Sequence, residues 1–226
     1  MRKLFIDTAN LDHIKKINSL GVIRGVTTNP SLISKEPKQN FDALIEQLAS
    51  FCQDSRLSLS VEVFASKPED MLIQARELHR ALSQAIDPDL LHIKIPVGFE
   101  ELTVIKQLSS EGINVNCTCC FTEQQLQLAA LSGSKYVSLF YSRLRDFSGN
   151  PPEVLRRTRG FIDTNGLDCE IIAGSIRSQG DVSGAWENGC DIVTCSYSII
   201  EQMTKHPKTD VSVAGFLRDF NNWIGN

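Results

Sequence analysis

A single lysine, Lys94, lies within the apolar run Leu90–Val97. Burying a lone ammonium group is costly unless the group is paired or loses its proton. A buried free amine is a nucleophile that can attack a ketone and form an imine. We therefore treat Lys94 as a candidate nucleophile, and the alternative is a purely structural ion pair with Asp7 or Glu62. His92 should share the face of Lys94, and we interpret it as a hydrogen-bonded core residue.

Polar side chains stand near the ends of several other short apolar runs, where they can surround the lysine. They are Asp7, Thr27, Thr28, Asn29, Glu62, Asn116, Thr118 and Ser138, and Phe140 follows in the same pattern. Carboxylates beside an imine-forming lysine can move protons during dehydration, carbon–carbon cleavage and hydrolysis. This chemistry requires neither a metal nor a cofactor, and we expect none.

Two further segments are suited to binding a phosphate group. Arg143 follows one apolar run, and Ser175-Ile-Arg177 follows the next. Two guanidinium groups and a hydroxyl can hold a terminal phosphate. Taken alone, each arginine is better explained as an ordinary surface charge, so the phosphate prediction depends on both flanking the same rim as Lys94.

The elements that would position these residues alternate between strands and helices. The predicted strands are 3–7, 23–27, 59–64, 90–95, 113–117, 136–140, 170–173 and 191–194, and the predicted helices are 11–20, 41–52, 68–85, 100–110, 123–131, 152–162, 179–188 and 198–204. Eight strand–helix units in 226 residues favour a closed (β/α)8 TIM barrel, and an open doubly wound sheet is the alternative. In such a barrel the strand ends meet at one rim. Residues 1–226 are read as one domain with an extra amphipathic helix at about 209–224.

Composition and cysteine usage narrow the class of protein. The net charge of −4 argues against nucleic acid as a partner, and no membrane segment or signal peptide is recognised, so a cytoplasmic protein is expected. Cys117, Cys119 and Cys120 stand close together. Strand alternation would put Cys117 and Cys119 on one face and Cys120 on the other, which favours free thiols over a metal site.

Five motifs in chain order resemble the small transaldolase family, which includes the fructose-6-phosphate aldolases. They are Phe5–Thr8, Gly25–Ser31, Ile93–Pro96, Gly112–Thr118 and Ala173–Arg177. The resemblance implies that Lys94 forms a Schiff base with a ketose donor, that Asp7 moves protons at the donor hydroxyls, and that Glu62 acts through a water. It also implies donor contacts from Thr27, Asn29, Asn116 and Ser138, support of that water by Thr118, and phosphate binding by Arg143 and Arg177.

Two positions separate the subgroups of this family. The aldolases typically carry glutamine and tyrosine where this chain has Glu62 and Phe140, and a phenylalanine cannot donate a proton. The resemblance thus favours transfer of dihydroxyacetone between sugar phosphates, for example from fructose 6-phosphate to erythrose 4-phosphate or to a specialised acceptor. A metal-free aldolase and a non-catalytic sugar-phosphate-binding barrel are the alternatives. The resemblance also implies a homo-oligomer, a pentamer or decamer.

Overall fold

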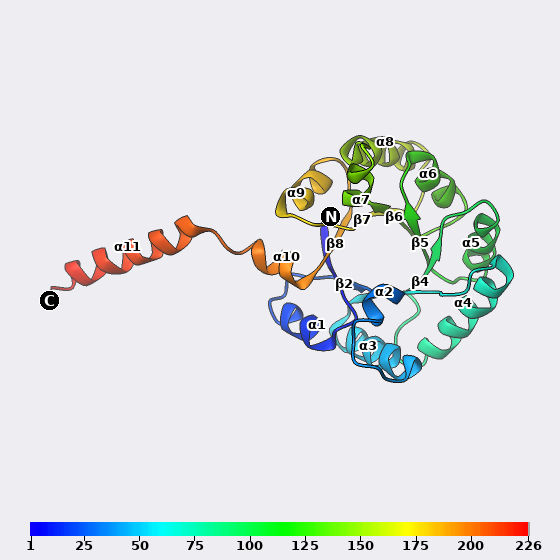
Figure 1. Ribbon diagram of the computed structural model, residues 1–226, viewed down its shortest axis with the longest axis horizontal. Coiled ribbons are helices and arrows are strands. Elements are labelled where there is room, and N and C mark those ends of the chain that lie inside the picture. Colours follow the sequence, from blue (N-terminus) through cyan, green and yellow to red (C-terminus); the bar gives the residue numbers. More distant parts are fainter. Residues whose placement is uncertain (226) are drawn as a thin grey trace.

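Eight strands form the centre of the protein in a computed structural model that describes residues 1–225 (Figure 1). All neighbouring strands are parallel, and β8 pairs with β1, so the sheet closes. This closure confirms the predicted (β/α)8 barrel and excludes the open sheet. The strands are β1 (Lys3–Asp7), β2 (Gly25–Thr27), β3 (Ser58–Glu62), β4 (Leu91–Pro96), β5 (Val115–Cys120), β6 (Tyr136–Phe140), β7 (Glu170–Gly174) and β8 (Ile192–Cys195).

Helices lie around the strands, and the last of them extends away from the barrel (Figure 1). They are α1 (Leu11–Asn18), α2 (Pro30–Ile33), α3 (Phe41–Ser55), α4 (Pro68–Leu82), α5 (Glu101–Ser110), α6 (Glu123–Leu131), α7 (Tyr141–Asp146), α8 (Pro151–Thr164), α9 (Gln179–Glu187), α10 (Tyr197–Gln202) and α11 (Pro207–Trp223). The sequence does not predict the short helices α2 and α7. Each begins within three residues of the end of a strand, and their first turns lie at the rim of the barrel.

The two faces of each strand separate the hydrophobic core from the barrel interior. Ile93 and Ile95 are fully buried in the core cluster that also contains helix residues such as Leu82 and Ile105. Because side chains alternate along a strand, Lys94 between them points into the barrel. This arrangement confirms the predicted orientation of the lysine strand.

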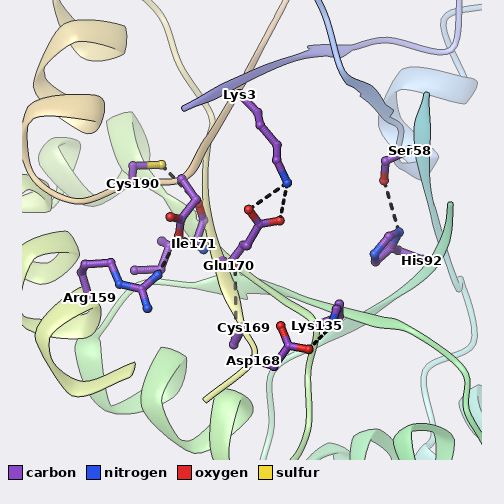
Figure 2. A network of polar contacts seen from close by, with 11 residues as sticks. Lys3, Ser58, His92, Lys135, Arg159, Asp168, Cys169, Glu170, Ile171 and Cys190 are labelled. Atoms are coloured by element: carbon purple, nitrogen blue, oxygen red, sulfur yellow. Dashed lines mark hydrogen bonds and ion pairs between the residues drawn. The ribbon is translucent and has the colours of Figure 1, made fainter. Parts of the chain in front are cut away.

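The end of the barrel opposite the strand C-termini contains polar and aromatic side chains. Lys3 Nζ lies 2.7 Å from Glu170 Oε2 (Figure 2). The His92 ring stacks on Tyr136 with centroids 4.0 Å apart. His92 Nδ1 lies 3.2 Å from Ser58 Oγ, and burial lowers the pKa of His92 to about 3. His92 is therefore a neutral, hydrogen-bonded core residue, as predicted, and takes no part in the rim above it.

The cysteine cluster departs from simple strand alternation. Cys119 has a left-handed backbone (φ 62°), and the register between β5 and β6 shifts between Cys117 and Cys120. Such a bulge adds one residue and reverses the faces that follow it. Cys117 and Cys120 therefore share the outer core, with their sulfurs 3.9 Å apart, and Cys119 faces the barrel. The predicted facing of these thiols is wrong.

The third strand ends earlier than the sequence suggests. The predicted strand runs from 59 to 64, and alternation would put its last residue, Phe64, on the face of Glu62. In the structure β3 ends at Glu62, and Phe64 is 62% exposed. Its ring packs edge-on against Phe41 at 5.4 Å, between α3 and the segment that precedes α4. Phe64 therefore lies outside the barrel interior.

The predicted C-terminal helix is α11, which stands clear of the barrel (Figure 1). Its large apolar side chains Phe216, Leu217, Phe220 and Trp223 are each more than half exposed. None of the helices in residues 1–225 combines the length and hydropathy needed to span a bilayer.

Candidate active site

A cavity of about 270 Å³ opens at the C-terminal ends of the strands. The predicted residues Thr28 and Arg177 do not line it, and all the others do: Asp7, Thr27, Asn29, Glu62, Lys94, Asn116, Thr118, Ser138, Phe140, Arg143 and Ser175. The residues lie on β1 to β6, in the segments that follow β2 and β7, and in α7. This is the rim at which barrel enzymes carry their chemistry.

Lys94 and Glu62 face each other at the base of the cavity. The strand register pairs Glu62 with Lys94, and Lys94 in turn with Asn116. Lys94 Nζ lies 2.9 Å from Glu62 Oε2 and also donates to the backbone carbonyl of Thr28 at 2.9 Å. The side chains of Lys94 and Glu62 are only 8% and 16% exposed, so the pair is held largely out of water. The amine can exchange a proton directly with the carboxylate.

Asp7 lies on the neighbouring part of the same wall, at the end of β1. Thr27 Oγ1 donates to Asp7 Oδ1 at 2.7 Å. Burial raises the pKa of Asp7, while Lys94 and the Thr27 hydrogen bond oppose that rise. A carboxylate in this environment binds a proton more readily than an exposed one does, which suits it to accepting a proton from a substrate hydroxyl.

A neutral polar group stands on the other side of Lys94. Asn116 Nδ2 donates to Ser60 Oγ at 3.2 Å, and Asn116 Oδ1 accepts from Ser138 Oγ at 2.7 Å. Both Asn116 and Ser138 are buried, as is Thr118 further along β5. These contacts fix the amide orientation and leave a wall of hydroxyl and amide groups for the hydroxyls of a polyol chain.

The mouth of the cavity carries a guanidinium group on an aromatic ring. Arg143, in the first turn of α7, lies over the Phe140 ring with Cζ 4.4 Å from its centroid. Phe121 packs edge-on against Phe140, with ring centroids 5.5 Å apart, and so helps to fix the position of the Phe140 ring. Ser175 lines the same mouth in a left-handed conformation (φ 56°), a strained backbone for a residue other than glycine. Arg143 and Ser175 thus stand where the sequence predicts a phosphate site.

Arg177 stands apart from the cavity wall. Its Nη1 donates to Asp146 Oδ2 at 2.6 Å, and both side chains are about half exposed. The loop that carries it is anchored by Asp181, whose Oδ2 accepts from the backbone N–H of Arg177 at 3.0 Å and from Ser142 Oγ at 2.9 Å. Burial alone would raise the pKa of Asp181, but donors led by Arg145 lower it overall. Asp181 therefore ties the α7 region to the loop after β7.

Several residues that line the cavity are not among the predicted site residues. They are Pro30, Ser31, Cys119, Ile172, Gly174 and Thr194. Alternation of side chains along the eighth strand would have predicted that Thr194 faces the barrel interior. Cys119 could not be predicted in this way because it lies in the β-bulge. Within residues 1–225, no three His, Cys, Asp or Glu side chains gather as a metal site.

The protein is thus a (β/α)8 barrel that carries a largely buried lysine–carboxylate pair in a cavity at the strand ends. The family described as "Transaldolase/Fructose-6-phosphate aldolase" matches residues 4–223. The chain belongs to this family.

Similar proteins from bacteria agree with this assignment. A probable transaldolase of Brachyspira hyodysenteriae is 42% identical over 223 residues, which cover 99% of each chain. A probable transaldolase of Agathobacter rectalis is 43% identical over 224 residues, which cover 99% of this chain and all of the relative. One from Thermodesulfovibrio yellowstonii is 42% identical over 218 residues, 96% of this chain and 97% of its own.

Proposed function

We propose that this protein is a transaldolase that transfers a dihydroxyacetone unit between sugar phosphates through a Schiff base on Lys94. The observation that carries the proposal is the largely buried Lys94–Glu62 contact of 2.9 Å, in a cavity that is also lined by Asp7. The names of the similar proteins and the transaldolase-like pair Glu62 and Phe140 support the same activity.

The first half of the reaction builds the imine and breaks a carbon–carbon bond. Lys94 gives a proton to Glu62 and attacks the ketose carbonyl carbon, and Glu62 then protonates the departing hydroxyl so that water leaves. Asp7 accepts the proton of the C4 hydroxyl while the C3–C4 bond breaks. The bonding electrons move to the iminium nitrogen, which leaves an enamine on Lys94 and releases an aldose phosphate.

The second half runs these steps in reverse with another aldose phosphate. The enamine carbon attacks the new aldehyde, Asp7 returns a proton to the forming hydroxyl, and a water assisted by Glu62 and Thr118 hydrolyses the imine. Thr27, Asn29, Asn116 and Ser138 hold the donor hydroxyls. Phe140 lines the cavity and offers no proton to the enamine, which favours its capture by an acceptor over release of dihydroxyacetone.

The substrate phosphate binds at the mouth of the cavity, near Arg143 and Ser175. Arg177 joins them when a phosphate dianion competes with Asp146, because an exposed ion pair of this kind contributes only about 0–1 kcal/mol. No metal or cofactor takes part. Seven free thiols are consistent with action in the reducing cytoplasm.

The dependence on an acceptor separates transfer from simple aldol cleavage. Fructose 6-phosphate alone should yield little free dihydroxyacetone, while added erythrose 4-phosphate should give sustained formation of sedoheptulose 7-phosphate. Both products can be followed by mass spectrometry, with a chelator present throughout. Rapid release of dihydroxyacetone without any acceptor would identify an aldolase instead, and binding without turnover would identify a sugar-phosphate-binding barrel.

We also propose that the chain forms a homo-oligomer in which α11 packs against a second copy. None of the α11 residues is buried in the single chain, although Phe216, Phe220 and Trp223 are apolar. The double variant Phe216→Asp with Phe220→Asp should therefore dissociate, because two charges would be buried at the contact. Sedimentation velocity should give an oligomeric mass for the wild type and for the control Asn222→Asp, and a lower mass for the double variant. A monomeric wild type at micromolar concentration would contradict the proposal.

A further inference from the structure

Thr194 forms the far end of a hydrogen-bonded chain that leads to Asp7. It lies on β8, is 4% exposed and lines the cavity, but it has no role in the reaction steps above. Its Oγ1 is 2.6 Å from Thr27 Oγ1, which is itself 2.7 Å from Asp7 Oδ1. Three strands, β8, β2 and β1, thus contribute one side chain each to a continuous row of oxygens.

The number of available protons determines which group donates and which accepts in each of these two hydrogen bonds. An ionised Asp7 can only accept, so the single hydroxyl proton of Thr27 points to Asp7 Oδ1. Thr27 then has only lone pairs to offer to Thr194, and Thr194 must be the donor between them. Without that donor, the Thr27 hydroxyl keeps its proton but loses the contact that fixes its rotation.

The position of Thr194 is itself constrained by its neighbours. The register of β8 with β1 pairs it with Phe5, two residues before Asp7 and on the same face. Its methyl carbon Cγ2 packs toward Gly174 on β7, where an added Cβ would already lie 3.6 Å away. A β-branched side chain has few favourable rotamers. Because the methyl group is held against Gly174, the Thr194 Oγ1 atom points across β1 toward Thr27.

We propose that Thr194 is a positioning residue for the reaction: it orients the Thr27 hydroxyl, which holds Asp7 Oδ1 and leaves Oδ2 to face the substrate hydroxyl. The inference rests on the proposed function, in which Asp7 accepts the proton released during carbon–carbon cleavage. A donor to Oδ1 stabilises the ionised carboxylate, the form that can accept that proton.

Loss of Thr194 should change the pH dependence of the reaction in a defined direction. Burial and the Glu62 carboxylate raise the pKa of Asp7. Lys94, the hydrogen bond from Thr27 and Arg143 lower it. Burial and, after it, the charge of Asp7 in turn raise the pKa of the Cys195 thiol nearby. A weaker Thr27 hydrogen bond removes one of the lowering effects. The pKa of Asp7 should then rise, and the acidic limb of kcat/KM should move to higher pH.

The test compares Thr194→Val, Thr194→Ser and the control Thr158→Val, all assayed for transfer across the pH range. Thr158 is a fully buried threonine on α8 whose hydroxyl has no partner among the described residues, so it reports the general cost of a buried Thr→Val change. We expect Thr194→Val to move the acidic limb of the kcat/KM profile up by about 0.5 pH unit, which lowers kcat/KM about threefold on that limb. Thr194→Ser, which keeps the hydroxyl, should stay close to the wild type.

Borohydride trapping of the ketose adduct, followed in every variant, separates this inference from the proposed function. The wild type and all three variants should form the adduct, because imine formation does not require the row. If the acidic limb of the kcat/KM profile does not shift in Thr194→Val, the positioning role is wrong even where the adduct forms. It is also wrong if Thr194→Ser loses as much kcat/KM as Thr194→Val does. A wild type that forms no adduct would overturn the proposed function and this inference with it.

Discussion

Replacing Lys94 with methionine should lower kcat/KM for transfer by at least about 10⁴-fold, the order of magnitude for loss of a covalent nucleophile. Methionine keeps most of the side-chain volume but cannot form an imine. Steady-state assays with fructose 6-phosphate and erythrose 4-phosphate measure the effect. The variant should still bind the ketose, because the hydroxyl and amide groups of the wall remain.

A control is needed because the substitution also leaves Glu62 without its partner. Breaking a largely buried ion pair costs about 3–5 kcal/mol, so thermal unfolding must show that the variant is folded at the assay temperature. Lys3→Met is the closer control, since Lys3 pairs with Glu170 in a partly buried contact at the opposite end of the barrel (Figure 2). A folded Lys94→Met enzyme that retains more than about one-hundredth of the activity would contradict covalent catalysis.

The second large effect is expected for Glu62→Gln. The amide preserves the size of the side chain but cannot carry protons during dehydration and hydrolysis, so kcat should fall about 10²- to 10⁴-fold. The loss should appear in kcat more than in KM, because the carboxylate acts in the chemical steps. Single-turnover mixing, in which imine formation and product release are timed separately, locates the slowed step.

The matched control for this change is Glu170→Gln. Glu170 also pairs with a lysine inside the barrel, Lys3, but at the end remote from the cavity. It should lose stability without a comparable loss of kcat. If Glu62→Gln and Glu170→Gln have similar kcat values, Glu62 is not the proton carrier.

Much of the barrel is predictable because the strands are short and mostly apolar, and several of them, such as β1, β2 and β3, end in a polar residue. The bounds of β1, β6 and α6 agree with the prediction, and the C-terminal polar residues converge as parallel strands require. The short helices α2 and α7 are not predictable in this way. Each is too short to show a hydrophobic period, and α2 depends on a local cap in which Asn29 Oδ1 accepts from the N–H of Leu32.

The parts of the cavity that the sequence misplaces depend on the backbone between regular elements. Cys119 faces the cavity because its own left-handed backbone shifts the register of β5. The pattern of apolar residues in the sequence does not predict such a bulge. Phe64 leaves the barrel because β3 ends two residues early. Arg177 lies beyond the wall because Asp146 and Asp181, contributed by two different helices, hold its side chain and its backbone.

The central claim is that Lys94 forms an imine with a ketose phosphate, and reductive trapping tests it most directly. The enzyme is mixed with fructose 6-phosphate, reduced with borohydride, digested and examined by mass spectrometry. A reduced dihydroxyacetone or fructose 6-phosphate adduct should appear on the peptide that contains Lys94 and be absent from the Lys94→Met variant. An active enzyme that forms no adduct, or one that carries it on another lysine, would contradict the claim.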